Sequence, residues 1–237
     1  FARPQDALTA LCAAMLAVVA WATAAWRFGL PTSESHALLA GLSGGALALG
    51  GGSAALNPGA WLRVGLGLVL SLLAGALAGR MARCFLSRHI CNCIAWQRIA
   101  AGLMAALHGV QDGQKFLALL LLADGLGEAE PSLPLSLLML TAGVMALGTA
   151  LGGRPIVEKV GSGLTALSPA DGLAADLGAG VVLLACSLLG LPVSTTHAKV
   201  AAILGAGRRP DWRTAGEIGG AWLLTFPACG LLARMMT

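Results

Sequence analysis

The strongest constraint in this sequence is a polar stretch of eight residues that occurs twice inside apolar sequence. Residues 29–36, the first polar segment, read G-L-P-T-S-E-S-H, and residues 190–197, the second polar segment, read G-L-P-V-S-T-T-H. Each copy follows an apolar run and leads into a second, short run rich in Ala and Gly. The duplication predicts two halves built on one plan, each with a polar site at the same position.

The composition indicates that most of the chain lies in a membrane. It is 57% hydrophobic and only 11% charged, whereas soluble domains carry roughly 25% charged residues. Apolar runs recur over the whole length, which predicts a single transmembrane domain over residues 1–237. We expect it to be all-α, because long Ala/Leu/Gly runs lack the alternation of a β-barrel. The net charge of +4 reports loop orientation here and does not indicate nucleic-acid binding.

The apolar runs predict spans at 7–26, 36–50, 61–79, 99–123, 133–151, 173–189 and 216–232. A basic loop at 80–98 is expected in the cytoplasm, and an acidic loop with Asp124, Glu128 and Glu130 outside. The spans that lead into the polar segments are the first and the sixth, so they run in opposite directions. The sequence therefore predicts an inverted repeat, which is typical of secondary transporters.

The residue types of the polar segments suit the start of a broken or re-entrant helix. Backbone breaks persist in a membrane only where protein or a water-filled cavity pairs the freed groups. Proline suits the first turn of a helix, and Ser or Thr can cap it or donate a hydroxyl to an oxyanion. Two helix N-termini aimed from opposite sides would enclose a small multivalent anion. The alternative is that the hydroxyls only cap helices and the histidines only pair with backbone.

Asp112 is a second candidate, because an ionisable group at membrane depth is costly and usually functional. It lies between Gly109 and Gly113, where we expect the backbone to open. A carboxylate there could hold Na⁺ or carry a proton. Lys115 could meet an anion, or the two residues could form a purely structural ion pair.

Two other patterns are weaker. Gly41-Leu42-Ser43-Gly44 has the form found in rhomboid-type intramembrane serine proteases, but aligning the two halves puts Ser43 opposite Leu204. We therefore expect no enzyme activity. His89, Cys91 and Cys93 cluster in the basic loop but offer too few ligands for a metal site, so neither a metal nor a cofactor is predicted.

At these motifs the chain resembles the inorganic phosphate transporter (PiT) family, which carries a G-A-N-D type motif and a G-x-P-x-S-x-[ST]-H type motif in each half. The latter is matched twice, and H-G-V-Q-D-G-Q-K at 108–115 stands where the family's second half reads like H-G-A-N-D-x-Q-K. The resemblance implies alternating-access symport of phosphate with Na⁺ or H⁺. It implies substrate binding by Gln111, Asp112, Ser33, Ser35, Ser194, Thr195 and Thr196, cation binding by Asp112, Gln111, Ser33 and Thr195, and support from Lys115, His36, His197 and Glu34.

The chain departs from the family pattern in three ways. Gln111 replaces Asn, and Glu34 stands where the family usually has a small hydroxyl residue. The first half lacks its own Asp motif, so we expect residues 1–93 to be a first repeat that is incomplete at its N-terminus and 94–237 to be the second. We interpret the chain as a fragment rather than a shortened relative.

These departures keep two alternatives open. One is a permease for sulfate or another oxyanion, and the other is a membrane partner that has lost transport. The expected location is the cell membrane, as a multi-pass protein of a bacterial inner membrane. Expected partners are inorganic phosphate, the lipid bilayer and, because related membrane proteins commonly pair, a second copy of the chain.

Overall fold

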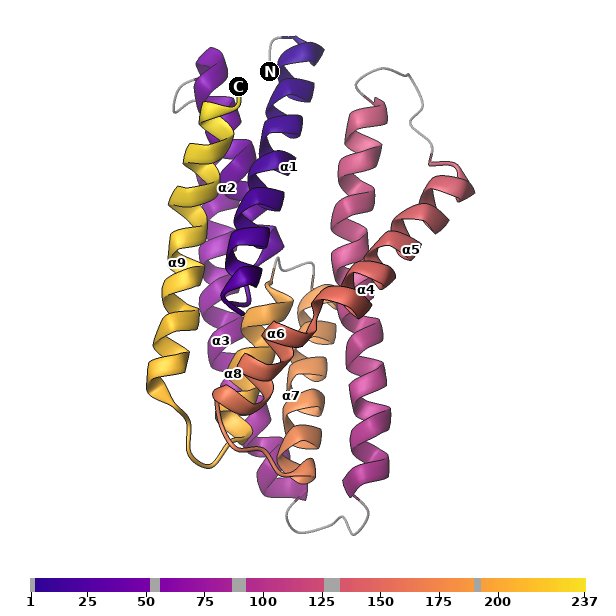
Figure 1. Cartoon of the computed structure of the whole chain (residues 1–237), viewed down its shortest axis with the longest axis vertical. Coiled ribbons are helices and arrows are strands. Elements are labelled where there is room, and N and C mark those ends of the chain that lie inside the picture. Colours follow the sequence, from indigo (N-terminus) through magenta and orange to yellow (C-terminus); the bar gives the residue numbers. More distant parts are fainter. Residues whose placement is uncertain (1–2, 52–55, 87–92, 126–132, 190–192) are drawn as a thin grey trace. The chain divides into compact units, whose positions relative to one another are not determined.

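The computed structural model describes residues 3–51, 56–86, 93–125, 133–189 and 193–237, and in these ranges the regular structure is helical. One isolated β-bridge joins Thr165 to Pro210. The elements, coloured along the chain in Figure 1, are α1 (Pro4–Arg27), α2 (Glu34–Ala46), η1 (Leu47–Gly51), α3 (Pro58–Leu86), α4 (Cys93–Gly125), α5 (Leu135–Gly152), α6 (Arg154–Glu158), η3 (Lys159–Gly163), α7 (Pro169–Leu188), α8 (Thr195–Ala206) and α9 (Trp212–Met235). The prediction of an all-α chain is confirmed.

Five helices of the described ranges, α1, α3, α5, α7 and α9, are long and apolar enough to cross a membrane. Helix α5 has no buried residue, and Leu151 on it is 78% exposed, as expected for a surface that faces lipid. Helix α4 is not among the five, and the polar stretch 108–115 lies in its middle. These helices confirm a polytopic membrane protein.

The helices that follow the polar segments are short. Helix α2 has 13 residues and α8 has 12, which at about 1.5 Å per residue is less than 20 Å. A hydrocarbon core is about 30 Å thick, so neither crosses it alone. The span predicted at 36–50 is instead a short helix followed by the π-helical turn η1, in agreement with the prediction of broken or re-entrant helices.

Helices α3 and α4 are longer than predicted, with 29 and 33 residues. Arg80 and Arg83, assigned to a loop from their charge, lie in the last two turns of α3, and Arg98 lies in the second turn of α4. Helices of this length exceed the hydrocarbon thickness, so charged side chains at their ends can reach the headgroup region. Four residues of the predicted loops, His89, Cys91, Glu128 and Glu130, lie outside the described residues.

The backbone opening predicted at Asp112 is wrong. Helix α4 is continuous from Cys93 to Gly125, through both Gly109 and Gly113. A glycine in a helix interior costs roughly 0.5–1 kcal/mol relative to alanine, but unpaired backbone groups in lipid cost several kcal/mol each. Keeping the helical hydrogen bonds is therefore more favourable than opening the backbone at the two glycines, and Asp112 projects from a regular helix.

The chain divides into two compact units, each made from separate stretches: residues 1–57, 111–155 and 219–237 form the first unit, and residues 58–110 and 156–218 the second. Helix α3 follows α2 in sequence but packs on α7 and α8. Residues 219–235 of α9 follow α8 in sequence but pack on α1 and α2. The helix that follows each short helix is thus exchanged into the other unit.

Glycine allows close helix contact inside each unit. In the first unit, a Cβ atom on Gly44 of α2 would lie 2.0 Å from the carbonyl oxygen of Gly230 in α9. In the second unit, a Cβ atom on Gly205 of α8 would lie 2.0 Å from the carbonyl oxygen of Ala76 in α3. Lipid is as apolar as leucine, so such helices associate through van der Waals contact, which small residues maximise.

We expect Gly44→Ala to lower the free energy of unfolding by about 1–3 kcal/mol, because the added methyl group must push α9 away. Gly143→Ala is the matched control, since nothing lies within 4 Å of its Cβ position on α5. Thermal unfolding in detergent micelles measures both. Equal midpoints for the two variants would contradict the assigned contact.

Candidate functional site

The first polar segment contains a break between α1 and α2. Gly29 adopts a φ of 64°, in the left-handed region that favours glycine. Its N–H donates to the Trp26 carbonyl at 2.9 Å, and the N–H of Leu30 donates to the Ala25 carbonyl at 2.9 Å. This pair of bonds is a Schellman motif. It ends α1 and satisfies its last carbonyl groups.

Helix α2 begins one residue after its N-cap, Ser33. Pro31 precedes the N-cap by two positions, so the prediction that it occupies the first helical turn is wrong. With no N–H and a fixed φ, Pro31 instead keeps the preceding chain out of a helix. The short helix therefore starts at Glu34 and leaves its first backbone N–H groups without partners inside the helix.

Two serine hydroxyl groups are buried at this N-terminus. Ser33 is 2% exposed and its side chain makes no capping bond. Among the described residues, the Oγ atoms of Ser33 and Ser35 have no hydrogen-bond partner. Burying an unpaired hydroxyl group costs about 1–3 kcal/mol. Two such groups beside a helix N-terminus form a set of donors suited to an anion.

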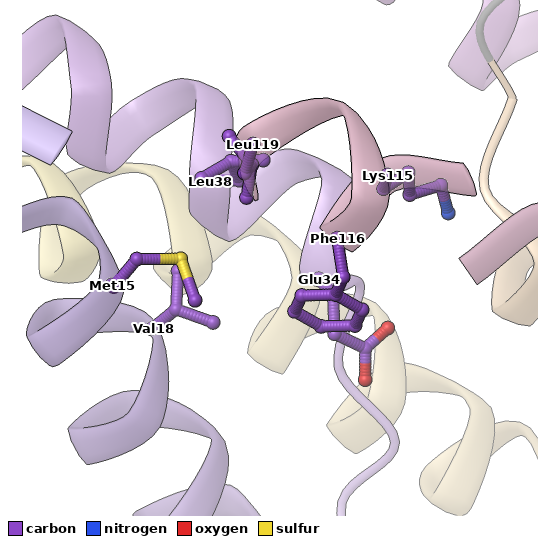
Figure 2. A pocket seen from close by; sticks show the side chains of 7 residues that line it. All are labelled: Met15, Val18, Glu34, Leu38, Lys115, Phe116 and Leu119. Atoms are coloured by element: carbon purple, nitrogen blue, oxygen red, sulfur yellow. The ribbon is translucent and has the colours of Figure 1, made fainter. Parts of the chain in front are cut away.

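His36 and Glu34 extend the first segment in different directions. His36 is 3% exposed, and its ring centroid lies 5.1 Å from that of Phe226 in α9. Glu34 lines a small pocket together with Lys115 of α4 and five apolar residues (Figure 2): Met15, Val18, Leu38, Phe116 and Leu119. Glu34 and Lys115 are the charged residues among those that line this pocket.

Asp112 is 8% exposed on α4, with the Lys115 ammonium 2.7 Å from its Oδ1 atom. The ion pair considered as the structural alternative is therefore formed. Gln111, half-buried, precedes Asp112 on the same helix. An ammonium beside the carboxylate lowers the cost of keeping Asp112 charged at membrane depth.

The second polar segment starts α8 differently. Gly190, Leu191 and Pro192 lie outside the described residues. Ser194 is the N-cap, and its Oγ accepts a hydrogen bond from the N–H of His197 at 3.4 Å. Capping, the alternative reading for the hydroxyls, thus holds at Ser194 and fails at Ser33. His197 and Thr195 are fully buried, and Thr196 is half-buried.

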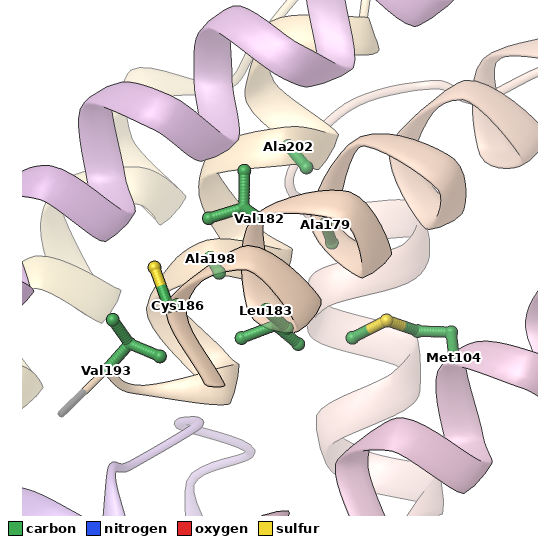
Figure 3. Packing of buried hydrophobic residues seen from close by; sticks show 8 residues of the cluster. All are labelled: Met104, Ala179, Val182, Leu183, Cys186, Val193, Ala198 and Ala202. Atoms are coloured by element: carbon green, nitrogen blue, oxygen red, sulfur yellow. The ribbon is translucent and has the colours of Figure 1, made fainter. Parts of the chain in front are cut away.

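Thr195 connects the second segment to the polar stretch of α4. Its Oγ1 atom lies 3.2 Å from Nε2 of His108. The preceding residue, Val193, belongs to a packed apolar cluster that fixes this end of α8 (Figure 3). The other members are Met104, Ala179, Val182, Leu183, Cys186, Ala198 and Ala202. Within the second unit, helices α4, α7 and α8 therefore hold Thr195 in place.

The predicted site residues fall into two sets. The first unit contains Ser33, Glu34, Ser35, His36, Gln111, Asp112 and Lys115, and the second contains Ser194, Thr195, Thr196 and His197. The stretch 108–115 contributes to both sets, because His108 belongs to the second unit.

Sequence reasoning missed a buried network in the second unit. Asp176 of α7 is 6% exposed and pairs with Lys199 of α8. Gln97 of α4 donates to the other carboxylate oxygen of Asp176 at 2.8 Å. A lone acid inside the predicted span 173–189, with a lysine in the next short run, was the available signal.

A sequence model described as "Phosphate transporter family" matches residues 1–98 and 89–233. The chain belongs to the phosphate transporter family. Relatives named "Probable low-affinity inorganic phosphate transporter" include one from Rhizobium meliloti (strain 1021), 34% identical over 94% of this chain and 72% of its own length. Another, from Bacillus subtilis (strain 168), is 29% identical over 98% of this chain and 74% of its own length.

A solved structure described as "The sodium-dependent phosphate transporter" has the same fold, with a TM-score of 0.86. It is 19% identical and covers 99% of this chain and 80% of its own. The resemblance to the phosphate transporter family is therefore confirmed. Its members are named as transporters, which bears out the prediction that the chain is not an enzyme.

The different roles of the two N-cap serines can be tested by stability. Ser194→Ala should lower the free energy of unfolding by about 1 kcal/mol, because it removes a capping bond. Ser33→Ala should leave stability unchanged or raise it, because it removes a buried hydroxyl group that has no partner. Thermal unfolding of both variants in phosphate-free detergent solution measures the difference. A larger loss for Ser33→Ala would show that its hydroxyl is a cap.

Proposed function

We propose that the protein takes part in secondary active transport of inorganic phosphate across the cell membrane, coupled to Na⁺ or H⁺. Membership of the phosphate transporter family supports the substrate. The observation that carries the proposal is the pair of buried, unpartnered hydroxyl groups of Ser33 and Ser35 at the start of α2. They are costly unless a ligand accepts their hydrogen bonds.

Phosphate suits these donors. Its oxygen atoms accept several hydrogen bonds at once, and its charge is favoured by the positive end of the α2 dipole. Within the first unit, Gln111 and Asp112 complete the proposed substrate set. In the second unit, the proposal assigns substrate contacts to Ser194, Thr195 and Thr196.

Asp112 is the proposed centre of cation coupling. We propose that Gln111 and Ser33 in the first unit, and Thr195 in the second, supply neutral oxygen atoms for the same purpose. A carboxylate serves Na⁺ and H⁺ alike, so either coupling ion fits Asp112. Lys115, Glu34, His36 and His197 act in support, by setting the charge and the orientation of these groups.

Alternating access follows from an inverted repeat over residues 1–93 and 94–237. The supporting observation is the reciprocal exchange of α3 and α9 between the units. Each polar segment is preceded by a long apolar helix and followed by a short helix. Because of the exchange, each short helix also packs against a long helix from the other half of the sequence. We propose that the protein acts as a dimer in a bacterial inner membrane.

One observation favours a second candidate, a membrane partner without transport activity. Lys115 already neutralises Asp112, and Glu34 places a second acid beside the unpartnered serines. In that case the polar residues would serve only stability. The two candidate functions differ in whether phosphate transport across the membrane depends on Asp112.

Asp112→Asn should lower phosphate uptake into proteoliposomes by about two orders of magnitude, the effect of removing one partner of a buried charge pair. The double variant Asp112→Asn with Lys115→Gln removes both charges and avoids a stranded ammonium, and it should be equally inactive. Asp124→Asn, in the last turn of α4, is the control and should transport normally. Normal uptake by the double variant would remove Asp112 from the mechanism.

Substrate class is tested by competition. Uptake of labelled phosphate should persist in a large excess of sulfate, because sulfate carries no proton to donate to Asp112 or to a backbone carbonyl at neutral pH. Arsenate, which matches phosphate in shape and protonation, should compete and serves as the positive control. Suppression by sulfate would favour the general oxyanion permease.

A further inference from the structure

The C-terminal helix α9 contacts the first polar segment at two points. The indole Nε1 of Trp222 donates a buried hydrogen bond to the Pro31 carbonyl at 2.9 Å, across 191 positions of sequence. One helical turn further along α9, Phe226 lies against His36 with ring centroids 5.1 Å apart. Ser33 and Ser35 lie between these two contacts in the sequence of the segment.

The break needs the indole because a backbone carbonyl in a membrane interior has no water to accept from. The N–H groups of Phe28, Gly29 and Leu30 are paired with the last carbonyls of α1. Pro31 has no N–H, and its carbonyl stands outside both helices. Trp222 is 9% exposed, so its N–H donates to this carbonyl from inside the protein.

Trp222 and Phe226 are four residues apart and therefore lie on one face of α9. The same contact continues to Cys229, which packs with Ala37 and Ala40 of α2 and Val18 of α1. Both helices that flank the break are thus packed against a single face of α9. This face fixes the entry into α2 at Pro31 and its first turn at His36.

We propose that Trp222 is a positioning residue, which orients the unpartnered hydroxyl groups of Ser33 and Ser35 toward their ligand by fixing the Pro31 carbonyl. The proposal rests on the function proposed above for those serines. Binding of an anion by hydroxyl groups depends on their direction, because hydrogen bonds weaken steeply away from linearity. Loss of the indole bond should therefore act on substrate affinity before it acts on folding.

Helix α9 supplies a matched control. Trp21 of α1 also donates its indole N–H to the first unit's part of α9, to Thr225 Oγ1 at 2.8 Å. This bond joins α1 to α9 and does not touch the polar segment. Trp21→Phe and Trp222→Phe each remove one indole donor and keep an aromatic ring.

The test measures amide hydrogen exchange of the complete protein in nanodiscs and phosphate uptake in proteoliposomes. Trp222→Phe should speed exchange at residues 28–36 by about three- to tenfold, the effect of one lost hydrogen bond. It should raise the KM for phosphate by a similar factor and leave kcat within about twofold. Trp21→Phe should change neither quantity at these residues.

Phe226→Leu is a second variant, which keeps the indole bond and removes the ring from His36. It should raise the KM without speeding exchange at residues 28–31. Exchange at residues 28–36 that is equal in Trp222→Phe and Trp21→Phe would overturn the proposal. Faster exchange in Trp222→Phe, with no phosphate uptake by the wild type, would support the role of the Trp222–Pro31 bond in fixing the segment and would refute the proposed function instead.

Discussion

The rest of the structure depends on one constraint: a backbone group freed inside a membrane has to find a partner within the protein. The break between α1 and α2 meets it almost completely. A Schellman motif satisfies the end of α1, and Trp222 satisfies the Pro31 carbonyl. Among the described residues, the hydroxyl groups of Ser33 and Ser35 are buried beside this break without a hydrogen-bond partner. The backbone groups that end α1 and the carbonyl of Pro31 are therefore paired, whereas these two hydroxyl groups are not.

The two polar segments solve the same problem with different chemistry. In the first unit, Trp222 and Phe226 of α9 contact Pro31 and His36, and Lys115 of α4 pairs with Asp112. In the second unit, ion pairs hold the helices, since Asp176 binds Lys199 and Gln97. Asp171, in the first turn of α7, forms an ion pair with Arg83 of α3, with 3.2 Å between Oδ1 and Nε. A duplicated motif thus need not imply duplicated roles, and Ser33 and Ser194 differ in the same way.

Sequence predicted what is local and failed where distant parts decide. The Gly, Pro and Ser residues of the polar segments predict backbone breaks, so the short helices that follow could be predicted from the sequence. The continuity of α4 could not be predicted in the same way. Gly109 and Gly113 suggest a backbone opening, but the cost of unpaired backbone groups in lipid prevents it. The exchange of α3 and α9 was also beyond reach, because Gly44 and Gly205 show a close contact without naming the partner helix. For the same reason, the sequence does not distinguish Trp222 from the other apolar residues of its predicted span, because its partner Pro31 lies 191 positions away.

The unpartnered serines connect stability to function. Each buried hydroxyl without a partner costs about 1–3 kcal/mol, a large share of a typical folding free energy of about 5–15 kcal/mol. Alanine would fit at either position without that cost, so a fold selected for stability alone has no reason to keep both. The close contact of Gly44 with α9 and the packing of α9 on α1 and α2 contribute van der Waals energy that offsets part of this cost. The packing of the first unit therefore compensates for two polar groups that, by themselves, destabilise it.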